Sequence, residues 1–443
     1  MKFRLLSVFA LLMAFHTGCD ALKGGSDKAK KEETEEEEDD EPKKKKKKKK
    51  DEGASSATAA ASASAAPTAA PAADAPPLID GPAPDKKKFA AFLKDDKAKM
   101  TPDIFETGLL MLQDCRLETH GIDYQCDAYK DFNKGLGHPA DLDDYKQRAE
   151  IGAKYLRHKA PAVRYEAVRR AASGIGIGNK DAQVKQILVA CRAETEPQVV
   201  GSCVDSIGYI AKDNADVKTF VFASLEHADD RVRDRAAQVL GSRINQPIDG
   251  AYDKLAERVE KDNTKKVKAT ACRGLSAPED PRALEVFKKL VEAKGTDEEV
   301  RNACFEGLIR LWAGYSYPKK PNEEAYELTM KVLEKKPRDD KRPPSSLMEL
   351  GSAKTEFKDY DKSGKEWAKA ASFYKKDRLV KVLEEIALDE EANQSARSSS
   401  LYALKSLGAK AQLTSLGTKL KAKKDSGSKY LSETATRLSK EKD

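Results

Sequence analysis

Apolar positions along the central part of the chain recur at a fixed spacing. A valine begins the pattern five times, followed by a small residue four positions later and by mostly apolar residues five and eight positions later. The five valines are Val163, Val199, Val232, Val267 and Val300. Offsets of 0, 4, 5 and 8 lie on one face of an α-helix, so each copy predicts an amphipathic helix. Intervals of 33 to 36 residues make these helices an internal repeat.

Each copy also contains a second apolar stretch after a turn. The five stretches are 182–191, 217–225, 251–259, 283–291 and 325–333. Turn-forming residues separate the two stretches, for example from Pro247 to Gly250. The pattern therefore predicts helical hairpins. Because one hairpin cannot bury its apolar face alone, we expect the hairpins to stack into an all-α solenoid.

The residue after the valine is basic in four of the five copies. These residues are Arg164, Arg233, Lys268 and Arg301. A late, degenerate copy begins at Ala396-Arg397. The arrangement resembles the HEAT repeat, in particular the short bacterial form that is also found in phycobilin lyases. The resemblance covers about 160–314 well and about 390–443 weakly, and it implies a HEAT-like solenoid with an extended surface for binding other proteins.

The chain outside the repeats changes composition several times, which predicts six segments. They are a lipoprotein signal peptide (1–18), a charged and Ala/Pro-rich disordered linker (19–86), a helical N-terminal cap (87–158), the HEAT-like repeats (159–314), an irregular helical segment (315–390) and a degenerate C-terminal repeat or cap (391–443).

The first residues predict export. Two basic residues precede an apolar run from Leu5 to Phe15, as in a secretory signal, and the run is short for a permanent membrane span. The ending Gly18-Cys19 resembles a bacterial lipobox, although His16 departs from the usual aliphatic residue. The resemblance implies lipidation of Cys19 and a place in the bacterial cell envelope, periplasmic or on its outer face, with inner versus outer membrane undecided. A soluble export signal and an uncleaved anchor are the alternatives.

The segment after Cys19 is expected to remain disordered because it has little apolar surface to bury. Residues 32–41 are almost wholly acidic, Lys43 to Lys50 are eight consecutive lysines, and residues 54–84 are mostly Ala, Ser and Pro. We interpret the segment as a tether; binding of the lysine run to an anionic surface is the alternative. The net charge of +7 does not indicate a nucleic-acid partner, because the rest of the chain interleaves both signs.

Six cysteines follow Cys19, and an even count in an exported chain favours disulfides. Proximity along the predicted helices favours the pairs Cys115 with Cys126 and Cys191 with Cys203; Cys272 and Cys304 then remain, on the first helices of neighbouring repeats, where a bridge is geometrically possible. The first pair would close over the turn at His120-Gly121. Buried free cysteines are the alternative, because three of the six stand at core offsets of the repeat, where free cysteine behaves as a small hydrophobe.

The sequence contains no convincing catalytic or metal-binding pattern. Asp359 to Gly364 resembles the opening of an EF-hand loop, but Ala370 stands where calcium needs a bidentate glutamate. A second candidate set has the wrong spacing for zinc: Cys115, His120, Cys126 and His138. We therefore expect a protein that is not an enzyme and has no cofactor or metal.

Aromatic residues gather where the repeat loses its register. The partner-binding candidates are Trp312, Tyr315, Tyr317, Trp367 and Tyr374. Tryptophan and tyrosine are enriched at interface hot spots, although large aromatics also fill irregular cores. The sequence thus predicts a non-catalytic, membrane-tethered HEAT-repeat scaffold that binds an unknown envelope protein. A structural spacer that grips an anionic polymer or lipid surface through Lys43 to Lys50, or a lyase-like enzyme accessory, is the alternative.

Overall fold

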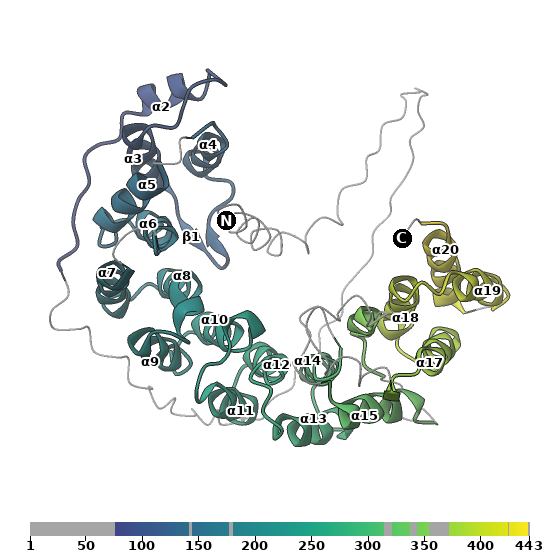
Figure 1. Cartoon of the computed structure of the whole chain (residues 1–443). Coiled ribbons are helices and arrows are strands. Elements are labelled where there is room, and N and C mark those ends of the chain that lie inside the picture. Colours follow the sequence, from purple (N-terminus) through teal and green to yellow (C-terminus); the bar gives the residue numbers. More distant parts are fainter. Residues whose placement is uncertain are drawn as a thin grey trace, which may run out of the picture. The chain divides into compact units, whose positions relative to one another are not determined.

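The computed structural model describes residues 76–140, 144–176, 180–313, 321–336, 343–353, 372–423 and 425–441. These residues form an all-α, HEAT-like solenoid of stacked helical hairpins, which confirms the predicted fold class (Figure 1). The predicted signal peptide, the lipidation site and the charged runs lie outside the described residues.

The first elements precede the repeats and have a small core of their own. The helices are α2 (Lys86–Phe92), α3 (Pro102–Met111), α4 (Asp127–Leu136) and α5 (Asp144–Lys154), with a 3-10 turn η1 (Leu112–Asp114) and a hairpin of strands β1 (Leu117–Glu118) and β2 (Gly121–Ile122). Phe89, Phe105 and Phe132 lie at the centre of this core. The antiparallel hairpin is a finding that the sequence analysis did not include, because only a turn was expected there.

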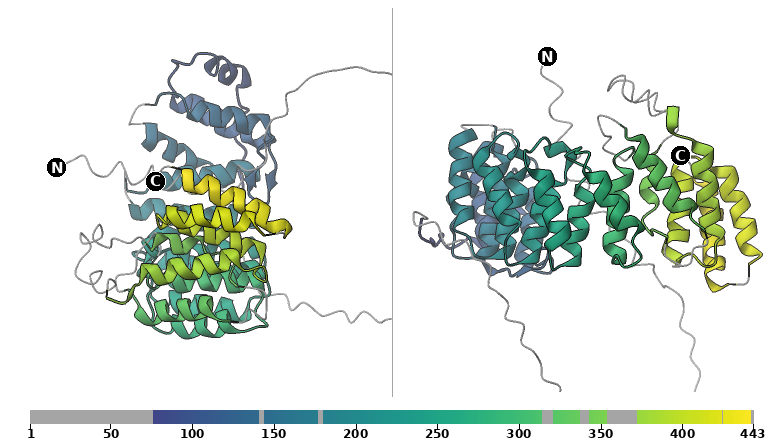
Figure 2. Two further views of the ribbon diagram at one scale, coloured as in Figure 1. Left: turned by 90° about the vertical axis from the view of Figure 1, so that its right-hand side faces the viewer. Right: turned by 90° about the horizontal axis from the view of Figure 1, so that it is seen from below.

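Five helical pairs follow in the register that the valines predict. The first helices are α6 (Pro161–Ser173), α8 (Pro197–Ile207), α10 (Asp230–Leu240), α12 (Lys265–Gly274) and α14 (Glu298–Ile309). The second helices are α7 (Lys180–Arg192), α9 (Ala215–Ser224), α11 (Ala251–Lys261), α13 (Ala283–Glu292) and α15 (Glu323–Glu334), and 3-10 turns extend α8 (η2, Gly208–Ile210) and follow α10 (η3, Arg243–Asn245). Figure 1 looks along these helices and shows the first helices in one layer and the second helices in another, while Figure 2 shows the pairs stacked on one another.

The C-terminal part continues the helical stack. Its elements are η4 (Met348–Ser352), α17 (Lys376–Leu388), α18 (Gln394–Ser406), α19 (Lys410–Lys421) and α20 (Ser426–Lys440). Helix α18 carries the late copy of the repeat, and its pattern residues Ala396, Leu401 and Leu404 are buried. The loop that resembles an EF-hand, Asp359 to Gly364, lies outside the described residues.

The repeated offsets form the core of the stack. In α10, Val232, Ala236, Ala237 and Leu240 are all 0% exposed. They belong to one hydrophobic cluster that extends from Leu156 to Leu438 and joins neighbouring repeats. The described repeats thus share a continuous core, as stacked hairpins require.

Replacing Ala236 by leucine is expected to destabilise the protein by about 1–3 kcal/mol, because α10 packs between α8 and α12 at this position and has no room for three more carbons. Urea unfolding followed by circular dichroism measures the change. Ala223, exposed on α9, gives the matched control, and its replacement by leucine should change stability by no more than about 0.5 kcal/mol. Equal stabilities of the two variants would contradict close packing of the first helices.

The basic residue after the valine is a structural ion-pair partner in the first repeat. Arg164 is buried, and its Nη1 donates to the carbonyl oxygens of His158 and Lys159, each at 2.8 Å, in the loop before its own helix. Its Nε donates to Glu194 Oε2 at 2.6 Å, in the loop before the next first helix. One guanidinium therefore joins two consecutive inter-repeat loops.

Arg233 repeats this arrangement two repeats later. Its Nη1 donates to the carbonyl oxygens of His227 and Ala228 at 2.8 and 2.9 Å, and its Nε donates to Asp262 Oδ2 at 2.8 Å. Arg397, in the late copy, donates to the carbonyl oxygen of Ala387, in the last turn of α17, and to Asp425. Arg164 and Arg233 thus each join two consecutive inter-repeat loops, and buried charges of this kind need their partners to remain stable.

A histidine occupies the same place before two of these arginines. His158 and His227 each lie six residues before the arginine. Nδ1 of His158 accepts the backbone N–H of Ala160, and Nδ1 of His227 accepts that of Asp229, both at 3.0 Å. Burial lowers the pKa of both histidines below the ordinary value, because a protonated ring would lose its hydrating water.

This burial predicts a loss of stability in mild acid. In the unfolded chain these histidines bind protons near their ordinary pKa of about 6.5, whereas in the folded chain they do so only at lower pH. The unfolded state therefore holds more protons as the pH falls through about 6.5, and stability falls with it. His227→Asn should reduce the drop between neutral pH and about pH 5, because an asparagine oxygen accepts the same N–H without titrating. Thr119→Asn, at an exposed site without a titrating group, should leave the drop unchanged; a drop in His227→Asn as large as in the parent protein would argue against this role.

Candidate functional site

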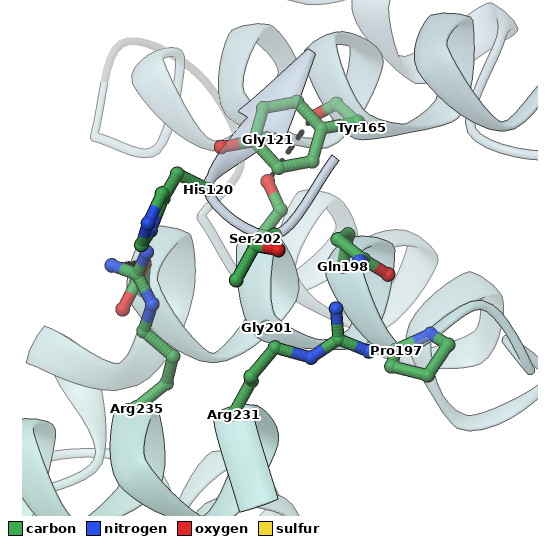
Figure 3. Close-up of a pocket in the computed structure, with 11 residues that line it drawn as sticks. His120, Gly121, Tyr165, Pro197, Gln198, Gly201, Ser202, Arg231 and Arg235 are labelled. Atoms are coloured by element: carbon green, nitrogen blue, oxygen red, sulfur yellow. Dashed lines mark hydrogen bonds and ion pairs between the residues drawn. The ribbon is translucent and has the colours of Figure 1, made fainter. Parts of the chain in front are cut away.

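A pocket lies on the first-helix side, where α6, α8 and α10 meet the tip of the β1–β2 hairpin (Figure 3). It is a depression open to solvent, and its volume of about 310 Å³ includes part of that solvent. The lining residues are Thr119, His120, Gly121, Tyr165, Pro197, Gln198, Gly201, Ser202, Asp205, Arg231 and Arg235. We call this site the Gly201 pocket.

The pocket exists because Gly201 has no side chain at a position where the other first helices carry one. Two positions after each valine stand Tyr165, Gly201, Asp234, Ala269 and Asn302. A Cβ added at Gly201 would meet only Arg235 Cγ, at an ordinary 3.7 Å, so the helix itself does not require glycine there. The absence of a side chain leaves the floor of the pocket open.

Two arginines of α10 supply positive charge to the pocket. Arg231 and Arg235 stand one turn apart; in Figure 3 Arg235 extends toward His120 of the hairpin, whereas Arg231 extends toward Pro197. Nη1 of Arg235 donates to Asp205 Oδ2 at 2.7 Å, and Nε of Arg231 donates to Asp229 Oδ1 at 2.9 Å. The hydrogen bonds that Arg231 donates to Asp229 lower the pKa of Asp229 and keep its carboxyl group ionised. A guanidinium carries five N–H donors, which is more than these carboxylates use.

The other walls of the pocket are polar and aromatic. Ser202 Oγ donates to the carbonyl oxygen of Tyr165 at 3.1 Å, which joins α8 to α6. Gln198 Oε1 is buried and has no hydrogen-bond partner among the described residues. Gly121 has a φ of 129° and packs against Tyr165, whose hydroxyl would lie 2.8 Å from an added Cβ. Only glycine therefore lets the hairpin tip come this close.

A buried carboxylate stabilises the part of α6 beside the pocket. Glu166 Oε1 accepts from Arg170 Nε at 2.6 Å and Oε2 accepts from Arg169 Nη1 at 2.9 Å. Burial alone would raise the pKa of Glu166, but the two arginines outweigh it and lower the pKa below the ordinary value. The guanidinium of Arg169 also lies 6.0 Å from the ring centre of Tyr165. This network limits the movement of the α6 surface next to the pocket.

The six cysteines are joined in three disulfides: the two pairs that the sequence favours and the third pair that it leaves. They are Cys115–Cys126, Cys191–Cys203 and Cys272–Cys304. The first disulfide closes the base of the hairpin whose tip lines the Gly201 pocket. The second joins α7 to α8, the next helix along the chain, and the third joins α12 to α14. Cys115 and Cys126, two of the four residues in the candidate zinc set, are thus bonded to each other. Within the described residues, no group of three or more potential metal ligands occurs.

The structure corrects the assignment of Trp312 and Tyr374 as partner-binding residues. Trp312 is 0% exposed and its Nε1 donates to Thr329 Oγ1 at 3.1 Å. Tyr374 is 8% exposed and its hydroxyl donates to the carbonyl oxygen of Ala353 at 2.8 Å. Both rings pack against Tyr326 and fill the core where the repeat register is lost. The remaining candidates, Tyr315, Tyr317 and Trp367, lie outside the described residues.

The fold and its repeated core define a HEAT-like α-solenoid. Comparison with known families agrees: residues 217–309, from α9 into α14, match HEAT repeats, which supports a HEAT-repeat protein. HEAT repeats commonly serve as protein-interaction scaffolds, and the fold is typically non-catalytic. No curated protein matches the chain. Within the described residues, none of the helices combines the length and the apolar character that crossing a membrane requires.

Proposed function

We propose that this protein is an exported, lipid-anchored and non-catalytic scaffold that binds another protein in the bacterial cell envelope. The repeat carries the proposal, because stacked helical pairs provide an extended surface made of many similar, exposed helix faces. On that surface the Gly201 pocket is the candidate binding site, since it combines a cavity with charged and polar groups from four elements.

The three disulfides support the exported location. Disulfides persist in oxidising compartments and are rare in the reducing cytosol. The basic and apolar leader and the Gly18-Cys19 pair point in the same direction. A lipid on Cys19, followed by a long polar linker, would leave the solenoid free to meet a partner at a distance from the membrane.

Photocrosslinking in intact cells tests the scaffold role. A benzoyl-phenylalanine placed at Gln198, in the pocket, should give one discrete covalent adduct with another protein. The same group at Lys185, exposed on the second-helix side in α7, serves as the control and should not give that adduct. Equal adducts from both positions, or none from position 198, would refute a partner on the first-helix side.

Two further variants test the anchor and the alternative function. Cys19→Ser should remove labelling by an alkyne fatty acid and release the protein from the membrane fraction. Replacement of Lys43 to Lys50 by serine should leave the adduct at position 198 unchanged. Loss of the adduct in this variant would favour the spacer that grips an anionic surface through its lysines.

A further inference from the structure

The three disulfides differ in how far solvent reaches them. Cys115 and Cys126 are both partly exposed. The other half-cystines lie in the core of the solenoid, each at most 2% exposed: Cys191, Cys203, Cys272 and Cys304. Thiol–disulfide exchange begins when a thiolate attacks a disulfide sulfur, so access to that sulfur controls the reaction. A reductant in the solvent therefore meets the first disulfide while packing protects the other two.

The two arms of the hairpin that this disulfide closes are held differently. The inner arm is β2, in which Ile122 is 3% exposed and belongs to the N-terminal core. Gly121 of the same arm packs against Tyr165 of α6, beside which it lies in Figure 3. The outer arm is the segment 116–120, which is exposed except for the partly buried Leu117. Packing thus anchors the inner arm more firmly than the outer arm.

Few hydrogen bonds join the outer arm to the inner arm. The strands β1 and β2 pair over two residues each. Below the strands, the backbone N–H of Asp123 donates to the carbonyl oxygen of Arg116 at 3.0 Å. A hairpin as short as this is at best marginally stable in water, whereas a cross-link at its base limits the open conformations available to it. The position of the outer arm therefore depends on the Cys115–Cys126 bond.

From these features we infer that the Cys115–Cys126 disulfide is a redox switch that controls access to the Gly201 pocket. The co-reactant is a dithiol reductant, such as a dithiol oxidoreductase. One of its thiolates attacks the Sγ of a half-cystine, the S–S bond breaks, and the other Sγ leaves as a thiolate that takes up a proton. The second thiol of the reductant then attacks the mixed disulfide. Cys115 and Cys126 end as two thiols, and the reductant ends as a disulfide.

Reduction changes the pocket through its wall. Thr119 and His120 line the pocket from the outer arm, so they leave its edge when that arm moves away. The surface of α6 and α8 around Tyr165 and Gly201 then admits a larger segment of a partner. Helix α4 keeps its place, because it begins at Asp127, after the hairpin. This inference goes beyond the proposed function, and its test does not require the partner.

Stepwise reduction tests whether the first disulfide is selectively accessible. The full-length protein is equilibrated with increasing concentrations of dithiothreitol, and the free thiols are alkylated and mapped by mass spectrometry. We expect Cys115 and Cys126 to be labelled at a reductant concentration at least about tenfold below the one that labels the four buried half-cystines. Labelling of all six at the same concentration would overturn the inference.

Hydrogen–deuterium exchange on the selectively reduced protein tests whether the arm is released. The amides of residues 116–123 should exchange about a hundredfold faster than in the oxidised protein, which corresponds to the loop-closure entropy that such a cross-link removes. Oxidised glutathione should restore the slow exchange. The segment 191–203 and the helical circular dichroism signal should not change, since the buried disulfides remain intact. Unchanged exchange in 116–123, or loss of the helical signal, would reject a switch.

Two variants complete the test. Cys115→Ser/Cys126→Ser should show the fast exchange without reductant, and if it does not fold, the reduced parent protein still gives the result. Tyr124→Ser is the matched control, because Tyr124 lies in the same loop, is 65% exposed and leaves the disulfide intact, so exchange should equal that of the parent. An adduct from position 198 in cells without release of the arm would reject the switch and leave the scaffold role. Release of the arm without an adduct would do the reverse.

Discussion

Trp312→Ala is expected to lower the free energy of unfolding by about 3–5 kcal/mol, as for other large aromatic side chains removed from a core. Trp312 is wholly buried, and its ring centre lies 5.1 Å from that of Tyr326 in an edge-to-face arrangement. Its removal leaves a cavity and takes away the donor that Thr329 accepts from. Urea unfolding monitored by circular dichroism measures the loss.

Tyr430→Ala provides the comparison for Trp312. Tyr430 is an aromatic residue of α20 that is exposed, so its removal should change stability by no more than about 0.5 kcal/mol. Trp312→Ala could instead unfold like the parent protein and lose the photocrosslinked adduct at position 198. In that case Trp312 binds a partner, and its assignment as a core residue is wrong.

Asp262→Ala is expected to destabilise the protein by about 3–5 kcal/mol, because it leaves a buried guanidinium without its carboxylate. The side chains of Arg233 and Asp262 are 9% and 1% exposed, and Asp262 Oδ1 also accepts the backbone N–H of Thr264 at 2.9 Å. The variant thus loses an ion pair and the turn that begins α12. Chemical denaturation gives the free-energy difference.

An exposed ion pair supplies the control for Asp262. Arg192 and Asp216 are 41% and 77% exposed and lie 3.4 Å apart. Because water screens such pairs, Asp216→Ala should change stability by no more than about 1 kcal/mol. Similar losses for Asp216→Ala and Asp262→Ala would show that the recurrent arginine does not hold consecutive repeats together.

The helical fold was predictable because its signal is local. Offsets of 0, 4, 5 and 8 depend only on the period of one helix, and five copies at similar intervals distinguish a repeat from chance. Val232 and Leu240 illustrate this, since both are completely buried in α10 as the pattern requires. The second helices follow for the same reason: the apolar stretch 251–259 lies within α11.

The features that sequence reasoning missed depend on contacts between distant residues. The basic residue after the valine was visible as a pattern, but the burial of Arg233 depends on Asp262, which is 29 residues away. The aromatic residues were misassigned because Trp312 lies where the period ends, and hydrophobicity alone does not tell whether a ring faces the core or the solvent.

The Gly201 pocket was missed for a related reason. Alignment of the five copies does show that Gly201 replaces a larger side chain present in most neighbours, and this signal was available in the sequence. The other wall comes from His120 and Gly121, which lie outside the repeat, and their approach to α6 and α8 is a matter of tertiary packing. The space left by the absent side chain at Gly201 forms a pocket only because the β1–β2 hairpin packs beside it.

The disulfide between α12 and α14 has a mechanical consequence. If a load on the C-terminal helices pulls against the N-terminal part of the solenoid, tension passes directly from Cys272 to Cys304 and bypasses the 31 residues between them, which include α13. About 100 Å of extended chain would thereby stay unreleased under load. The covalent cross-link therefore prevents this section of the solenoid from extending under such a load.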